Sequence, residues 1–395
     1  MRPGMACVLE VLRDETNRRP VALTEWQDAF QVAEQETILP YFAARLRQTG
    51  AALPGPIQDD LSRAEREAAR NSFWWTSELR GILQAFAAAA IPVIPLKGPM
   101  LAERIYGGIA LRQSCDLDLL VRPEHIGSAS SQLEKLGFTS ISRPSDHDYA
   151  WRRGTTLVEL HFDVENPRAF NFDVAGAWKR AGRRDFLGQQ VWQFAPSDEL
   201  LYVCLHGVRH RFERLSHVLD IALALNCLVP EIDPTAYEHG PAARLRRLIV
   251  LGRAMAMRLD PSSNPALELR ESAKTAAHME KLADKRWTAL LECPGTRLDW
   301  LNQHRFYLET EATTTGRLLR MAGDLSILAT RTIQQDFDFA ARFGVEQPAL
   351  VWMLRQFRLL AKLCGLDLGA RKAAYQTPTP VHSSQDQPAY PRGKP

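Results

Sequence analysis

Four short apolar runs between residues 91 and 165 constrain the fold of this chain more than any other feature. Each is too short for a helix and rich in β-branched or aromatic residues, which is typical of a strand. The runs are IPVIPLKG (91–98), DLDLLVRP (116–123), YAWRR (149–153) and TTLVELHFDV (155–164). Pro92 and Pro95 place the first run at a sheet edge or a strand start, and Gly154 predicts a turn between the last two runs.

Helical patterns separate the first three strands. One starts at Pro99 and ends at Gly107, and the other spans PEHIGSASSQLEKLGF and ends at Gly137. Proline suits the first helical turn and glycine suits the residue after the last turn. Because strands and helices alternate, the sequence predicts an α/β or α+β core of about 110 residues.

Helical segments flank this core on both sides. The first helix is expected to open at Thr24, an N-cap residue with Gln27 as its capping-box partner. The last twenty residues, which contain many Pro, Ser and Gln, predict disorder. The resulting prediction is an α+β protein in four regions: an N-terminal helical region (1–88), a core with a small mixed sheet (89–195), a C-terminal helical domain (196–375) and a disordered tail (376–395).

The balance of charge excludes some function classes. Lys and Arg number 49 and Asp and Glu 46, a net charge of +3, which does not favour a general binder of nucleic acid or of anionic membranes. The six cysteines form no CxxC pair, so a zinc knuckle or redox motif is not indicated. The apolar stretches fall short of a membrane span of roughly 20 residues, and no signal peptide is apparent. We expect a cytoplasmic protein.

Two aspartates interrupt the second strand. Side chains at alternate positions of a strand share a face, so Asp116 and Asp118 point together while Leu117 and Leu119 face the core. Adjacent carboxylates repel each other unless a cation lies between them. Oxygen ligands suit Mg²⁺ or Mn²⁺ rather than zinc. The alternative is a solvent-facing strand edge without a function.

A third carboxylate lies on the last strand. Glu159 stands between apolar neighbours, and beside the aspartates it would complete a site for two metal ions. Asp163 competes for this role, and Glu159 is preferred because its flanks are more apolar. His161 shares the face of Glu159 and is interpreted as orienting a metal-bound carboxylate, as contacting a phosphate, or as a core histidine.

The turn after the first strand is a candidate anion site. Gly98 directly precedes a helix, whose N-terminal N–H groups and dipole attract phosphate, and Lys97 adds a positive charge. An ordinary strand-to-helix turn is the alternative.

Together these motifs resemble the uncharacterised nucleotidyltransferase family of bacteria, part of the DNA polymerase β-like nucleotidyltransferase superfamily. The matching positions are Leu96, Lys97, Gly98, Leu101, Tyr106, Arg112, Asp116, Asp118, Leu120, Val121, Glu159 and His161, followed by His206, Leu215 and Asp220 in a helical region. The chain departs from better-known members at Pro99, where they carry serine, and in the longer segment between Gly98 and Asp116.

The resemblance implies metal-dependent transfer of a nucleoside monophosphate from a nucleoside triphosphate (NTP) to a hydroxyl group of a small molecule, peptide or glycan precursor. Asp116, Asp118 and Glu159 would hold Mg²⁺ or Mn²⁺. The residues expected to bind the nucleotide are Lys97, Gly98, Arg112, His161 and His206, with Arg112 as a phosphate clamp. Two alternatives stay open: a degenerate nucleotide-binding module, and an RNA-modifying enzyme, which the near-neutral charge disfavours.

Roles outside the metal site are also predicted for the helical region after the core. Arg209, Arg211 and Arg214 are interpreted as a solvated basic face. Asp220 is either a packing partner for a nearby arginine or a site residue, and the structural role is preferred.

Overall fold

The computed structural model describes most of residues 1–321 and a few residues between 344 and 357. The gaps in the first range are 17–18, 142–146, 166–169, 262–266, 268, 293–299, 312, 314 and 319. Residues 1–329 form one compact unit and 330–395 a second. The expected disordered tail, 376–395, lies outside the described residues. The division into four regions stays a prediction.

A five-stranded mixed sheet forms the centre of the first unit. The strands are β1 (Val93–Pro95), β2 (Leu117–Val121), β3 (Thr139–Ser140), β4 (Asp148–Arg153) and β5 (Thr156–His161). Their order is β1-β2-β5-β4-β3. The pair β2–β5 is parallel and the other pairs are antiparallel. The predicted α+β class with a mixed sheet is confirmed, and β1 lies at the sheet edge as its prolines indicate.

Short helical segments connect the strands as the glycines predict. After β1 come α5 (Gly98–Leu101), the π-helical turn η2 (Ala102–Tyr106) and the 3₁₀ turn η3 (Ile109–Leu111). After β2 come η4 (Pro123–His125) and α6 (Ile126–Lys135). Gly107 and Gly137 end these segments with φ of 74° and 84°, a conformation that favours glycine.

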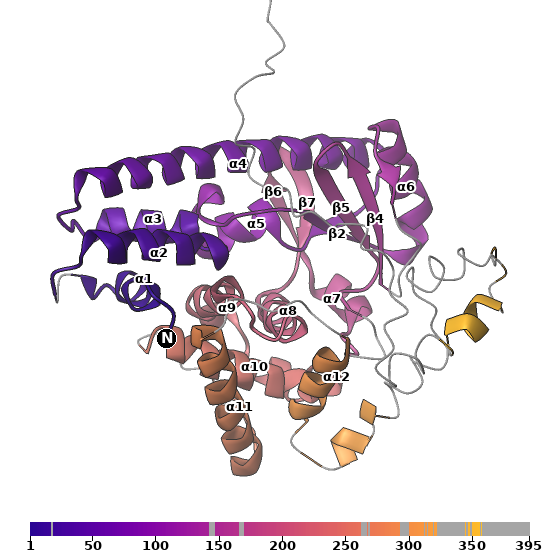
Figure 1. Cartoon of the computed structure of the whole chain (residues 1–395). Helices are drawn as coiled ribbons and strands as arrows, with labels where there is room; N and C mark the ends of the chain where they lie inside the picture. Colours follow the sequence, from indigo (N-terminus) through magenta and orange to yellow (C-terminus); the bar gives the residue numbers. More distant parts are fainter. Residues whose placement is uncertain are drawn as a thin grey trace, which may run out of the picture. The chain divides into compact units, whose positions relative to one another are not determined.

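The N-terminal region is helical, and its longest helix covers the sheet. Its helices are α1 (Met5–Leu12), α2 (Leu23–Gln35), α3 (Leu39–Gln48) and α4 (Gly55–Ala88). In Figure 1, α4 runs along the sheet as one long violet helix. The expected N-cap at Thr24 is wrong, because α2 already begins at Leu23 with Ala22 as N-cap and no side-chain cap. The observed start differs from the expected one by a single residue, a shift that is common at helix ends.

The two faces of the sheet differ in chemistry. The apolar face of the sheet packs against α4 and α6. The cluster includes Leu79 and Phe86 of α4, Leu133 of α6, and Leu119 and Leu160 of the sheet. Successive residues of a strand point to opposite faces. Asp118 and Glu159 therefore lie on the face away from α4.

A second, unpredicted hairpin follows the sheet. It pairs β6 (Gly182–Phe186) with β7 (Gln189–Gln193) and is preceded by α7 (Val174–Arg180), whose N-cap Asp173 accepts a hydrogen bond from Gly176 N at 2.9 Å. Its sequence shows little apolar alternation, since only Phe186 and Val191 are buried. The usual period-two signal of a strand is therefore weak here.

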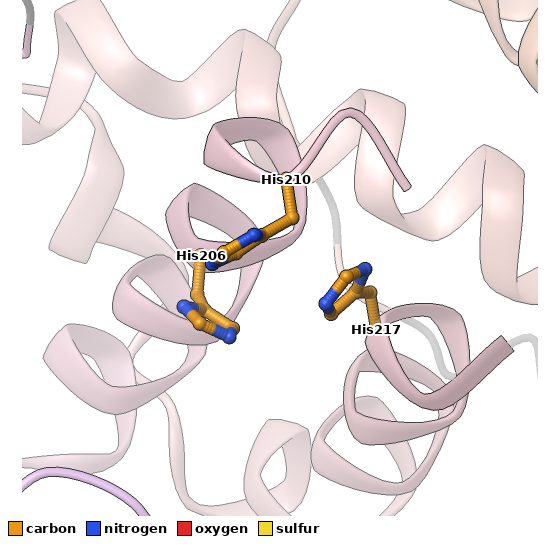
Figure 2. A group of neighbouring side chains, drawn as sticks. All are labelled: His206, His210 and His217. Atoms are coloured by element: carbon orange, nitrogen blue, oxygen red, sulfur yellow. The ribbon is translucent and has the colours of Figure 1, made fainter. Parts of the chain in front are cut away.

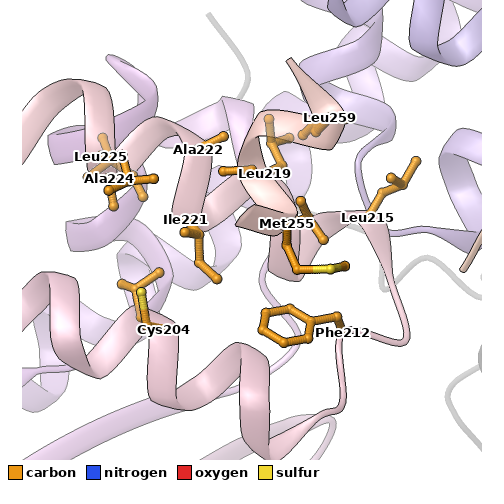
Figure 3. Packing of buried hydrophobic residues seen from close by; sticks show 14 of the residues in the cluster. Cys204, Phe212, Leu215, Leu219, Ile221, Ala222, Ala224, Leu225, Met255 and Leu259 are labelled. Atoms are coloured by element: carbon orange, nitrogen blue, oxygen red, sulfur yellow. The ribbon is translucent and has the colours of Figure 1, made fainter. Parts of the chain in front are cut away.

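The C-terminal helices form a second core with the N-terminal helices and the acidic side of the sheet. They are α8 (Pro196–Arg209), α9 (Leu215–Leu228), α10 (Gly240–Leu259), α11 (Ala273–Glu292) and α12 (Trp300–Glu309), with short turns η5 (Val229–Glu231) and η6 (Pro234–Tyr237). Figure 3 shows Cys204, Phe212, Ile221 and Met255 meeting between α8, α9 and α10. Within the described part of the chain, every helix is too short or too polar to cross a membrane.

Candidate active site

Two carboxylates lie side by side on the polar face of the sheet. Asp118 of β2 and Glu159 of β5 are direct partners in the parallel pairing. Neighbouring strands lie about 4.8 Å apart, so the register by itself brings these side chains together. Asp118 is 3% exposed, and a carboxylate so deeply buried needs a compensating cation or hydrogen bonds.

Two basic side chains surround this carboxylate pair. The Lys97 ammonium forms an ion pair with Asp118 Oδ2. The His161 Nε2 atom lies 3.5 Å from Asp118 Oδ1 and 3.4 Å from Glu159 Oε2. Burial alone would raise the pKa of the Glu159 carboxyl, but His161, Lys97 and Arg209 together lower it to about 2. Glu159 is therefore an anion across the physiological pH range.

The donors of this cluster fit a divalent cation. One ligand atom each from Asp118, Glu159 and His161 lie within 4.8 Å of one another. Among the described residues, the Oδ1 atom of Asp118 is buried and has no hydrogen-bond partner. A bound cation would be the missing partner of this oxygen. Carboxylate oxygens suit Mg²⁺ and Mn²⁺, and an imidazole nitrogen is compatible with Mn²⁺. Asp116 precedes β2 and is not part of this cluster, so its metal role stays a prediction.

The turn at Gly98 joins the cluster to the helical segment that follows. Gly98 has φ of 68°, where a side chain would be strained. Gly98 opens α5, and Lys97, the residue before it, pairs with Asp118. A phosphate contact of Lys97 and Gly98 stays a prediction.

Arg112 has an internal partner. Its Nε and Nη2 atoms each donate a hydrogen bond of 2.9 Å to the carboxylate of Asp220 on α9, and Tyr106 donates one of 2.6 Å to the same carboxylate. Asp220 is thus the packing partner of an arginine, as predicted. The clamp that we predicted at Arg112 does not match this geometry, because two of its donors already bind Asp220.

The comparison with protein families decides the identity of the chain. Residues 23–259 match the family described as uncharacterised nucleotidyltransferase. The chain belongs to this family. The resemblance predicted from the sequence is therefore confirmed, and nucleotidyl transfer is the activity that the family name supports. A comparison with curated proteins finds no match.

Three solved structures are similar to this member of the family. The solution structure of the antibiotic-resistance factor ANT(2'')-Ia has 16% identity and covers 43% of this chain and 88% of its own, with a TM-score of 0.31. The crystal structure of ANT(2'')-Ia with adenylyl-2''-tobramycin has 16% identity, coverage of 45% and 97%, and a TM-score of 0.32. An antigenic nucleotidyltransferase-like protein from Paracoccidioides brasiliensis has 19% identity, coverage of 47% and 93%, and a TM-score of 0.33. TM-scores this low do not support a functional comparison.

The basic residues at the end of α8 in this family member do not form the expected solvated face. Arg211 is 5% exposed and pairs with Glu213, and Arg209 is half-buried with its Nε 3.3 Å from Glu165 Oε2. Only Arg214 is exposed. The prediction is wrong for Arg211 because α8 ends at Arg209, so the helical spacing used to place it does not continue.

Two residues near the site escaped the sequence analysis. The ring of His147 lies 5.9 Å from that of His161, and Glu165 pairs with Arg209. A hairpin register that pairs Arg153 with Thr156 also pairs Asp148 with His161, so His147 lies one residue beyond that pair. Glu165 carried no local signal, because its partner comes from a helix that is distant in the sequence.

Proposed function

We propose that this nucleotidyltransferase transfers a nucleoside monophosphate from an NTP to a hydroxyl group of a small molecule, peptide or glycan precursor, with release of pyrophosphate. The observation that supports the proposal is the register of β2 and β5, which sets Asp118 beside Glu159 with Lys97 and His161 around them. Three acidic or imidazole donors next to a lysine form a site in which a cation and a polyanion can bind together.

The anionic residues have a binding role. We propose that Asp118 and Glu159 hold a divalent cation, Mg²⁺ or Mn²⁺, with Asp116 as a further ligand. When bound, such a cation neutralises charge on the triphosphate and lowers the pKa of the acceptor hydroxyl. The pKa of Glu159, about 2, makes it a poor proton acceptor at neutral pH. Its role is therefore to bind and to neutralise charge rather than to act as a general base.

The basic residues act on the donor. Lys97 forms an ion pair with Asp118 and can stabilise negative charge on a phosphate oxygen bound beside it. His161 orients both carboxylates by lying between them, at 3.5 and 3.4 Å. No covalent intermediate is needed, since positioning and charge neutralisation account for most of the catalysis of phosphoryl transfer.

The alternatives differ in turnover and in acceptor. A degenerate module would bind nucleotide without releasing pyrophosphate, and an RNA-modifying enzyme would release it only with RNA. The ion pair between Lys97 and Asp118 is relevant to the degenerate module. A cation that binds Asp118, or an NTP that binds Lys97, must first displace this ion pair.

The test is pyrophosphate release from labelled NTPs with Mg²⁺ or Mn²⁺, with and without candidate hydroxyl acceptors and RNA. We expect release with a small-molecule, peptide or glycan acceptor, and a loss of roughly 100-fold or more in Asp118→Asn, because one charged ligand is removed. His239→Ala, which alters an exposed histidine, is the control and should keep full activity.

Two results would contradict the proposal. If Asp118→Asn kept the activity of the unmodified chain, the carboxylate pair would not be the site of reaction. If NTP bound in calorimetry but no acceptor or metal gave release, the chain would be a binding module.

A further inference from the structure

Three histidines meet outside the carboxylate cluster. His206 and His210 lie one turn apart at the end of α8, where residues four positions apart share a helix face. His217 lies in the first turn of α9. Figure 2 shows the His217 ring on the opposite helix, facing the other two rings.

The three rings are close enough to share one ligand. The ring centroids are 4.5 Å apart for His206 and His210, 4.9 Å for His210 and His217, and 5.6 Å for His206 and His217. One nitrogen from each ring lies within 4.8 Å of the others. Three nitrogens on one tetrahedral Zn²⁺ stand roughly 3.4 Å apart, so side-chain rotations that move the nitrogens by about 1 Å close the site.

Simple ring packing does not account for the whole cluster. Among the described residues, the Nδ1 atom of His217 is buried and has no hydrogen-bond partner. A buried polar atom without a partner is rare in native proteins and points to a missing ligand, water or ion. A metal bound to this nitrogen would satisfy it.

We propose that His206, His210 and His217 bind one divalent transition-metal cation, with Zn²⁺ as the best fit and the fourth position open to water or an anion. Imidazole nitrogens suit Zn²⁺, Cu²⁺ and Ni²⁺ and suit Mg²⁺ poorly. Three protein ligands with one open position are typical of an accessible zinc site. This site is distinct from the carboxylate cluster, which consists of Asp118, Glu159 and His161.

The surroundings favour the ligating form of the rings. Burial lowers the pKa of all three histidines, to about 3 for His217, so the imidazoles are neutral at physiological pH. Nearby cations contribute to the same shift: Lys97 acts on all three rings and Arg214 on His210 and His217, while Asp220 opposes it at His217.

Lys97 and Arg214 also favour an anion as the fourth ligand of the metal. A metal bound here adds positive charge beside Lys97 and Arg214, which an anionic ligand such as hydroxide or a phosphate oxygen would offset. The open position therefore favours an anion over neutral water. Lys97 acts on all three rings and also pairs with Asp118, so the histidine site and the proposed reaction centre share this charged residue.

The test is Zn²⁺ binding to the full chain, measured by calorimetry and by metal analysis after dialysis, in excess Mg²⁺, which competes for the carboxylate oxygens of Asp118 and Glu159. We expect one Zn²⁺ per chain. His217→Ala and the more conservative His210→Gln should each weaken Zn²⁺ binding by roughly 100-fold or more, because each removes one of three direct ligands and the loss of an outer partner alone costs roughly 10–100-fold. His239→Ala removes an exposed histidine and should bind Zn²⁺ as tightly as the unmodified chain.

Asp118→Asn separates this site from the proposed function. It should lose pyrophosphate release and keep Zn²⁺ binding, so the two proposals fail independently. The inference is overturned if the unmodified chain binds no Zn²⁺, if Asp118→Asn weakens Zn²⁺ binding as much as His217→Ala does, or if His210→Gln, shown to be folded by circular dichroism, keeps the full affinity. His210→Gln decides the outcome if His217→Ala does not fold.

Discussion

The side chains of Arg112 and Asp220 show how a residue singled out for chemistry can serve the fold. Both are largely buried, with 15% and 3% of their side chains exposed. The bidentate geometry, with both bonds at 2.9 Å, is the strong form of this pair. Removing one member of such a pair leaves the other charge buried without compensation.

We expect Asp220→Ala to lower the free energy of unfolding by about 3–5 kcal/mol, because Arg112 then lacks its partner. Urea denaturation measures this change. Glu65→Ala breaks an exposed ion pair, in which the side chains of Glu65 and Arg47 are 40% and 55% exposed. This change should lower the free energy of unfolding by less than about 1 kcal/mol. Similar small losses for both variants would contradict a structural role of Asp220.

Arg112→Lys distinguishes the two roles of the arginine. Lysine cannot reproduce the bidentate bond, so a structural role predicts reduced stability with an unchanged KM for NTP. A phosphate clamp predicts the reverse: a raised KM with stability unchanged.

Among the elements, α8, α9 and α10 pack so closely that two glycines are required. A Cβ atom on Gly252 of α10 would lie 2.8 Å from Cys204 Sγ, and one on Gly207 of α8 would lie 2.7 Å from Phe212 Cε1. Figure 3 shows Cys204 and Phe212 lying within this core. The close approach of the helices brings His206 and His210 opposite His217.

We expect Gly252→Ala to lower the free energy of unfolding by about 1–3 kcal/mol, because the added methyl group overpacks the core. Gly81 of α4 is the matched control, since a Cβ atom there meets nothing within 4 Å. Gly81→Ala should raise the free energy of unfolding by about 0.5–1 kcal/mol through higher helix propensity. Thermal denaturation of both variants measures the difference, and a stabilising Gly252→Ala would show that the helices are less tightly packed.

On the scale of the whole molecule, ion pairs connect the sheet segment to the C-terminal helices. Arg104 of η2 lies with its Nη1 2.6 Å from Glu199 Oε2 in the first turn of α8. Burial raises the pKa of Glu199 more than Arg104 lowers it, so that the pKa is about 7 against an ordinary value of 4.5. The folded chain therefore binds a proton at Glu199 more tightly than the unfolded chain does.

The stability contribution of Glu199 is present below about pH 4.5 and is lost as the pH rises through about 7. We expect the free energy of unfolding to fall by on the order of 1–3 kcal/mol between about pH 5 and about pH 8, relative to Glu199→Gln, which cannot ionise. Urea denaturation at several pH values measures this difference. Parallel pH profiles for the two proteins would contradict the raised pKa.

The sheet also depends on helices outside the predicted core. Residues of α4, including Leu79 and Phe86, cover its apolar face. We expect a fragment of residues 89–195 to lack stable structure, because this face would be exposed to water. Circular dichroism and proton NMR measure this, with residues 1–329 as the folded control. A cooperatively folding 89–195 fragment would support an independent core domain.

The sequence by itself determined the local structure of this protein. The alternation around Asp118 and Glu159 predicted strands, the prolines of β1 predicted a sheet edge, and Gly107 and Gly137 predicted helix ends. Each of these signals depends only on backbone geometry within a few residues. The resemblance in the same segments predicted the family.

Only the tertiary structure decided which distant residues meet. The bond of Arg112 to Asp220 and the approach of His217 to His206 join residues 108 and 11 positions apart. Asp118 and Glu159, which we expected to lie together, are 41 positions apart, and the register of β2 and β5 makes them direct partners. Strand register and helix packing depend on the burial of whole faces, so a local pattern predicts which residues are polar and which are apolar but not which partner each one finds.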